Sequence, residues 1–180
     1  PDDDDGPEAV PDDVRRAVAD AFFASDHGRA WSAPAAGASS DAIDRERTAE
    51  TVVRAAIDFA ADETGGDPLR WSPVVVELFM LDWLPRRVTL PATAGPMAAD
   101  IVHDWARHTA ADRQIPPRAV TMLDEAVDRH RDEMSSFMAD ESHWGPAKTI
   151  AMRAIAEGVD AGDPDAMQAF IDRVNRDGGA

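Results

Sequence analysis

The chain has 180 residues, no cysteine and a single lysine, Lys148, among its 18 basic residues. Without cysteine it can form neither a disulfide nor a thiolate metal site. No apolar run approaches the roughly 20 residues that a membrane-spanning helix needs, and no signal-peptide pattern is present. We therefore expect a cytoplasmic protein without a membrane partner.

Motifs that mark the common catalytic and nucleotide-binding sites are also absent. The sequence contains no GxSxG, no GxGxxG, no glycine-rich phosphate loop and no HExxH. These absences exclude the enzymes and nucleotide-binding proteins that depend on such motifs. We expect no cofactor. Whether the protein is an enzyme stays open, with a non-catalytic role favoured.

Acidic residues outnumber basic ones by 35 to 18, which gives a formal net charge of -17. Such a surface repels nucleic acid and anionic lipid unless its arginines cluster, and the arginines here lie scattered among acids. We expect no nucleic-acid partner. The acid-rich residues 1–10 predict a flexible linker or tail, and residues 11–180 a single all-helical domain.

The most apolar segment is WSPVVVELFMLDWLPRRVTL, residues 71–90. Ser72 is suited to cap a helix and Pro73 to occupy its first position, and we expect Pro85 to end it. Between them, apolar side chains cover nearly the whole circumference at helical spacing. A helix that is apolar all round is buried, so the pattern predicts a buried central helix over about residues 72–85.

Six further segments predict amphipathic helices, each with one apolar stripe at helical spacing. They begin near residues 11, 40, 96, 117, 146 and 164, and segments rich in glycine or proline separate them. Strand patterns are weak throughout. The sequence therefore predicts an all-α, single-domain bundle of about seven helices around the central one.

Two carboxylates, those of Glu77 and Asp82, interrupt the apolar central helix. A charge on a buried helix needs a partner of opposite sign. Three arginines flank the helix and are the candidates, namely Arg70, Arg86 and Arg87. We predict structural carboxylate–arginine pairs, because the two carboxylates project to roughly opposite sides and cannot act together in catalysis.

His130 falls in the middle of the apolar face of the segment after Pro117, and Glu133 lies one turn later at the edge of that face. A histidine in such a position is most often a core residue that is hydrogen-bonded through one nitrogen. A buried histidine near a carboxylate is also a candidate ligand-binding or pH-sensitive group.

Asp100, His103 and Asp104 lie at helical spacing on one turn, so one helix can present all three to a metal ion. They are weak metal-site candidates. Arg107 follows His103 by four residues, and this spacing is typical of an ion-paired face in solvent, which we favour.

Three segments resemble the C-terminal helical region of a group of uncharacterised actinobacterial proteins. They are WSPVVVELFMLDWLPRRVTL, IVHDWARHTAADRQIPPRAV and WGPAKTIAMRAIAEGVDAGDPDAM, within roughly residues 71–176. WSP, LDWLPR and WGPAK are the most specific pieces. Some proteins of this group also carry a plasmid ORF-3-like or SEC-C domain. The resemblance implies a bacterial cytoplasmic helical module fused to other domains, and it assigns no catalytic residue.

These observations favour a non-catalytic helical module that mediates protein–protein interaction or self-association, as part of a larger multidomain protein. The alternative is a metal- or small-ligand-binding protein, or an enzyme. It would use His130 with Glu133, or the cluster of Asp100, His103 and Asp104.

Overall fold

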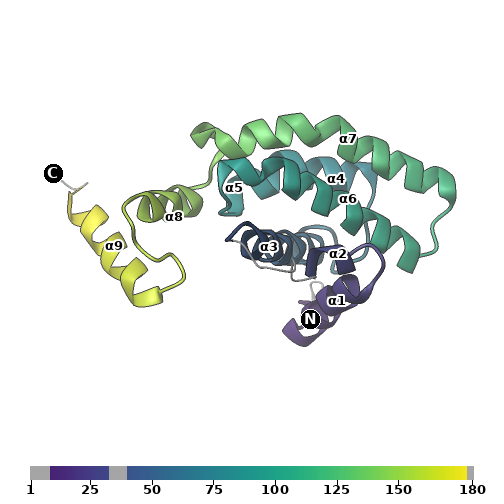
Figure 1. Cartoon of the computed structure of the whole chain (residues 1–180), viewed down its shortest axis with the longest axis horizontal. Helices are drawn as coiled ribbons and strands as arrows, with labels where there is room; N and C mark the ends of the chain where they lie inside the picture. The colour runs from purple at the N-terminus through teal and green to yellow at the C-terminus, as the bar shows by residue number, and fades with distance from the viewer. Residues whose placement is uncertain (1–8, 33–39, 178–180) are drawn as a thin grey trace, which may run out of the picture.

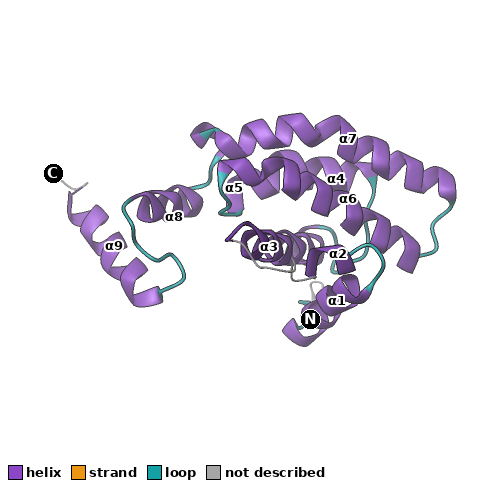
Figure 2. Cartoon of the chain, viewed as in Figure 1, coloured by secondary structure: helices purple, strands orange, loops and turns teal. Residues whose placement is uncertain are grey.

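The computed structural model describes residues 9–32 and 40–177, and every regular element within them is helical (Figure 2). The α-helices are α1 Asp12–Ala24, α2 Arg29–Ser32, α3 Ser40–Glu63, α4 Pro73–Leu78, α5 Leu84–Arg87, α6 Gly95–Asp112, α7 Pro117–Ala139, α8 Pro146–Ala156 and α9 Pro164–Asp177. A π-helical turn, η1 (Phe79–Trp83), joins α4 to α5, and the 3-10 turns η2 (Ala92–Ala94) and η3 (Glu141–His143) precede α6 and α8. The predicted all-α class is confirmed. Residues 1–8 of the predicted acidic tail lie outside the described residues.

Prolines mark the start of several helices, as the sequence predicts. Pro117, Pro146 and Pro164 are the first residues of their helices, where the missing N–H has no intrahelical partner to lose. Ser72 caps the helix that begins at Pro73, because its hydroxyl oxygen accepts the N–H of Val75 at 3.3 Å. Local chemistry thus fixes where these helices begin.

The central helix does not end at Pro85, as predicted, but continues to Arg87. In a regular α-helix a proline removes one hydrogen bond, and its ring clashes with the carbonyl group four residues earlier. Here the turn before Pro85 is π-helical, and the N–H of Leu84 bonds to the carbonyl of Phe79, five residues back. The wider turn accommodates the ring, so the helix passes through the proline without a break.

The helices up to α7 form one body (Figure 1). Helices α6 and α7 make the largest interface between helices, α4–η1–α5 packs against α7, and α3 packs against α6. Helices α1 and α2 lie against α3. In Figure 1, α8 and α9 extend away from this body on the side of α5.

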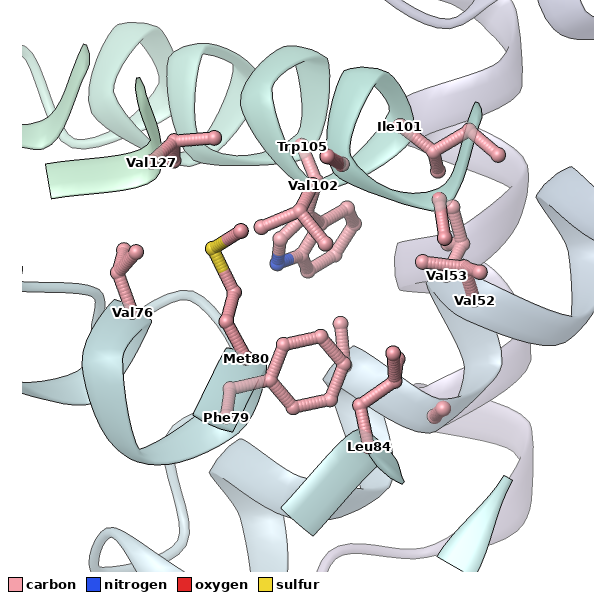
Figure 3. Close-up of a cluster of buried hydrophobic side chains, with 14 of the residues drawn as sticks. Val52, Val53, Val76, Phe79, Met80, Leu84, Ile101, Val102, Trp105 and Val127 are labelled. Carbon is pink, nitrogen blue, oxygen red and sulfur yellow. The ribbon is translucent and has the colours of Figure 1, made fainter. Parts of the chain in front are cut away.

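The core lies between α3, the central helix, α6 and α7 (Figure 3). Phe79, Met80, Leu84 and Trp105 are all fully buried there. Aromatic rings continue through the core, and the ring of Trp71 lies 5.4 Å from that of Phe79 and 6.3 Å from that of Trp105. None of the described helices is long and apolar enough to cross a membrane.

One prediction about the central helix is wrong. It is not buried all round, because the side chains of Val74 and Leu78 are 62% and 51% exposed. These residues lie one turn apart, with the half-buried Leu81 following on the same side. Val74, Leu78 and Leu81 form an apolar surface that we call the α4 strip. The periodicity indicates an apolar helix, but it does not say how many neighbours surround it.

Candidate functional site: the arm and the groove at its base

Residues 146–177, which comprise α8, α9 and the loop between them, form an arm that is fastened to the body at its base. The ammonium group of Lys148 donates to the carbonyl oxygen of Pro85 at 2.7 Å. The backbone N–H of Gly145 donates to the carbonyl oxygen of Arg86 at 2.9 Å. We call these two contacts the clasp. Carbonyl groups in the last turn of a helix lack intrahelical donors, and the clasp supplies them.

Lys148 is buried, with 1% of its surface exposed, and makes no ion pair with any described residue. Its nitrogen lies 5.1 Å from the centre of the Trp144 ring, which attracts a cation. The end of a helix also carries partial negative charge, which favours a cation at α5. These contacts offset only part of the lost hydration, because burial lowers the pKa of Lys148 to about 8.

The tryptophan, glycine and proline of the segment WGPAK, residues 144–148, each make a different contribution to this junction. The indole N–H of Trp144 donates to the carbonyl of Met138 at 3.0 Å, which fixes it at the end of α7. A Cβ atom at Gly145 would lie 2.9 Å from the carbonyl oxygen of Arg86, so the close approach there needs glycine. Pro146 then starts α8. The segments LDWLPR and WGPAK therefore meet in space.

The face of α8 that holds Lys148 continues beyond the body. Ala151, Met152 and Ile155 follow Lys148 at helical spacing, and Val159 continues their line past the end of the helix. We call these four apolar residues the arm face. Met152 is half-buried, whereas Ile155 is 47% exposed. The face is packed at the base of the arm, and Ile155 is its one exposed residue, since Ala151 and Val159 are also half-buried.

Helix α9 packs against α8, and Phe170 is its buried apolar residue. Met167, Ile171 and Val174 remain partly exposed. Arg173 of α9 links the two helices, because its guanidinium group lies 2.5 Å from the carboxylate of Glu157 at the end of α8, which Arg153 of α8 also approaches at 3.2 Å. The pKa of Glu157 is lowered by these two arginines, with Arg173 the larger cause. Two helices alone leave much of their apolar surface in water.

A groove of about 760 Å³ lies between the body and the base of the arm. Its lining comprises Phe59, Glu63, Thr64, Leu78, Asp82, Trp83, Arg86, Arg87, Gly145, Pro146 and Ala147. The charged groups are paired, Arg86 with Asp82 at 3.1 Å and Arg87 with Glu63 at 3.5 Å. The groove therefore offers an apolar floor with a charged rim. The hydroxyl of Thr64 in this lining donates to the carbonyl oxygen of Ala60 at 2.7 Å, so it is not directed at a ligand in the groove.

The predicted partners of Glu77 and Asp82 are found in part. Asp82 pairs with Arg86, but both side chains are more than half exposed, so the prediction of a buried charge is wrong. Glu77 is also exposed, and its carboxylate lies 3.9 Å from Nε2 of His130. Arg70 makes no ion pair with any described residue, and Arg87 turns to Glu63 on α3.

His130 is buried at the interface of α4 and α7, with 8% of its surface exposed. Its Nδ1 atom has no hydrogen-bond partner among the described residues. Glu133, its predicted neighbour, is exposed, and no hydrogen bond or ion pair joins these two described residues. The acid beside His130 comes from α4, which the sequence could not indicate because Glu77 lies 53 residues earlier in the chain.

Asp100, His103 and Asp104 do not converge on a common point. Asp100 pairs with Arg131 on α7 at 2.5 Å, and Asp104 accepts the indole N–H of Trp31 at 2.8 Å. His103 lies 3.1 Å from the carboxylate of Asp124. Among the described residues, no group of three or more acidic or histidine side chains is placed to hold a metal ion.

Asp124 is the centre of a small ion-paired cluster on this face. Nε and Nη2 of Arg107 donate to its two oxygens at 3.0 and 3.1 Å. The guanidinium of Arg107 is the main cause of the lowered pKa of Asp124, with His103 adding to it. The face is therefore ion-paired, as predicted, but the pairs run between α6 and α7, and Arg107 makes no ion pair with Asp104 on its own helix among the described residues.

The sequence alone did not identify the residues of the clasp as a site. The signal that pointed to them is the single lysine, which ends the segment Trp144-Gly145-Pro146-Ala147-Lys148. Comparison of the chain with models of protein families, with curated proteins and with solved structures finds no match. The resemblance to actinobacterial proteins therefore stays a prediction.

Proposed function

We propose that this chain is a non-catalytic helical module that mediates protein–protein interaction or self-association through its α8–α9 arm. The observation that carries the proposal is the arm face, which is packed at its base and uncovered at Ile155. As the resemblance implies, we further propose that the module is cytoplasmic and belongs to a larger multidomain protein.

The arm is poorly stabilised by the chain that carries it. Ala154 and Phe170 are its buried apolar side chains among the described residues, whereas Met152, Ile155, Met167, Ile171 and Val174 all keep contact with water. Each apolar side chain that a partner covers contributes roughly 25 cal/mol for every Å² removed from water. A projecting pair of amphipathic helices with an uncovered face is a common form of docking element.

Substitutions on two sides of α8 test this proposal. Ile155→Asp places a charge on the arm face, and Ala156→Asp places the same charge next to it, on an exposed position that points elsewhere. We expect both proteins to melt within a few degrees of the parent. Cross-linking of the purified protein, alone and with candidate partners, should lose its products with Ile155→Asp only. If both substitutions abolish the cross-linked products, or if neither does, the arm face is not a specific docking surface.

The catalytic or ligand-binding alternative has less support. His130 has an acidic neighbour, but it is covered by α4, and the lining of the groove does not include it. The side chains of Asp100, His103 and Asp104 are held by three separate partners. Neither set presents a pair of groups to a common substrate.

A further inference from the structure

The arm is packed separately from the body. Within the described residues, the continuous apolar core ends at Met138, and no apolar side chain of the arm joins it. The buried apolar side chains of the arm, Ala154 and Phe170, lie outside that core. The contacts of α8 with the body are concentrated at α5, and the rest of the arm extends away from it (Figure 1). A segment with few buried apolar contacts to the rest of a protein opens more easily than the core does.

The chain between the body and the arm has a natural pivot at Gly145. The residues before it are held on α7, because the ring of His143 stacks on that of Phe137 at 3.9 Å, and the indole N–H of Trp144 donates to the carbonyl of Met138. Gly145 follows directly, and a glycine backbone has the widest choice of conformations. The arm can therefore swing about Gly145 while Trp144 stays on the body.

The docked position of the arm requires the burial of a charge. The ammonium group of Lys148 gives up its hydration there and gains one carbonyl oxygen and the face of one ring. A buried cation with so little compensation favours any state in which water returns to it.

No carboxylate of an adjoining element compensates the charge of Lys148. The charged and titratable groups on these elements pair with one another, apart from the exposed Glu141. They are Asp82, Arg86 and Arg87 of the central helix, Glu63 at the end of α3, Asp140, Glu141 and His143 before α8, and Arg153 and Glu157 of α8 itself.

We propose that the arm is a hinged unit that swings off the body about Gly145, and that the charge on Lys148 promotes its release. In the docked state the amine is buried against Pro85, and in the undocked state it is hydrated. A neutral amine still donates an N–H to the carbonyl of Pro85. Deprotonation therefore keeps the hydrogen bond of the clasp and removes the cost of burying a charge. Undocking needs no binding partner, so it does not depend on the proposed function.

The direction of the pH dependence follows from the two environments of Lys148. Burial lowers the pKa of Lys148 to about 8 when the arm is docked, whereas a hydrated lysine has its ordinary value of 10.5. The proton binds more tightly to the undocked state and therefore stabilises it. Raising the pH from 7 to 9 should lower the ratio of undocked to docked arm by about tenfold.

Distance measurements between two spin labels test the proposal. The chain has no cysteine, so two introduced cysteines are the sole labelling sites. Asp132→Cys on α7 and Ala156→Cys on α8 place the labels at exposed positions on the body and on the arm. Double electron–electron resonance should give a narrow distance for the docked arm and a broad component for the undocked arm. We expect the broad component at pH 7 to shrink by pH 9.

A reference pair separates undocking from unfolding of the body. Ala111→Cys on α6 and Asp132→Cys on α7 are both exposed, and both lie on the body. Their distance should stay narrow and unchanged at pH 7 and pH 9. If this distance broadens together with that of the arm pair, the whole chain loosens, and the arm is not a hinged unit.

Three substitutions in the arm-labelled protein separate the roles of the pivot and the lysine. Lys148→Gln keeps an N–H donor without a titrating charge and should remove the pH dependence. Gly145→Ala places a Cβ atom 2.9 Å from the carbonyl oxygen of Arg86, so it should enlarge the broad component at both pH values. Arg153→Met removes an exposed charge from the same helix and should leave the pH dependence unchanged.

Two further results would overturn the proposal. A single narrow distance at pH 7, in the parent and in Gly145→Ala alike, shows an arm that does not undock. A broad component that keeps its size between pH 7 and pH 9, or whose pH dependence survives Lys148→Gln, shows that the charge on Lys148 does not control release.

Discussion

Nζ of Lys148 lies 2.7 Å from the carbonyl oxygen of Pro85, although 63 residues separate them in the chain. The single lysine of the protein thus holds the carboxyl end of the helix that the sequence marks as central. A lysine suits this position better than an arginine, because its compact ammonium group places one charge against one carbonyl. The cost is a buried cation without a carboxylate beside it.

The buried cation predicts that the protein becomes more stable as the pH rises into the alkaline range. The pKa of Lys148 is about 8 in the folded protein and 10.5 for a lysine side chain in water, so the unfolded chain binds the proton more tightly. The free energy of unfolding should therefore rise with pH between these two values, by at most about 3 kcal/mol, and stay lowered below pH 8. Urea unfolding at a series of pH values measures the rise.

The composition of the chain leaves few other side chains that titrate in this pH range. The chain has no cysteine and no tyrosine, so above about pH 8.5 Lys148 is the one side chain expected to titrate until arginine does. Lys148→Gln keeps an N–H donor for Pro85 but cannot titrate, and it should abolish the slope. A slope that survives this substitution, or a flat profile in the parent, would refute the assignment.

Arg15 gives a second prediction, on the attachment of α1. Its guanidinium binds Asp58 at 2.7 Å and Asp62 at 2.5 Å on α3, and these hydrogen bonds raise its pKa further above its usual range. The carboxylates are partly exposed, so we expect Arg15→Met to lower the free energy of unfolding by only about 1 kcal/mol. The neighbouring Arg16 is exposed and makes no ion pair within the described residues. Arg16→Met should therefore change stability by less than about 0.5 kcal/mol.

Much of the fold could be predicted because local chemistry determines it. Pro117 and Pro146 set helix starts through their own backbone geometry, and apolar spacing identified each amphipathic helix. The course of the chain through Pro85 could not be predicted in this way. The π turn lets the helix continue through Pro85 with Phe79 and Leu84 both buried in the core, and that packing involves residues far away in the sequence.

The exposure of residues at the candidate site could likewise not be predicted from the local sequence. The sequence shows that α8 has an apolar face, but the position of Ile155 beyond the edge of the body depends on where Lys148 meets Pro85. Likewise, the composition of α4 indicates burial all round, yet Leu78 is 51% exposed. Amphipathicity identifies a surface that needs a partner, and it does not say whether that partner is part of the same chain.

Asp104 distinguishes a structural role from metal binding. Its carboxylate accepts the N–H of Trp31, which is 7% exposed and also lies beneath the guanidinium of Arg45. Asp104→Asn keeps an acceptor oxygen and should cost less than about 0.5 kcal/mol. Asp104→Ala leaves the indole N–H unpaired and should cost about 1–3 kcal/mol. Equal losses in both variants, together with a melting temperature of the parent that rises on addition of Zn²⁺ or Mn²⁺, would favour a metal ligand instead.

His130 gives the last prediction, because its buried Nδ1 atom has no partner among the described residues. A buried polar atom without a hydrogen bond opposes folding, so an apolar side chain of similar size should be tolerated. We expect the free energy of unfolding of His130→Leu to lie within about 1 kcal/mol of that of the parent. Met134→Ala, one turn away on the same face and fully buried, should cost about 2–5 kcal/mol through the cavity it leaves. If His130→Leu proves as damaging as Met134→Ala, the histidine has a partner that the folded chain alone does not supply, and the ligand-binding alternative gains support.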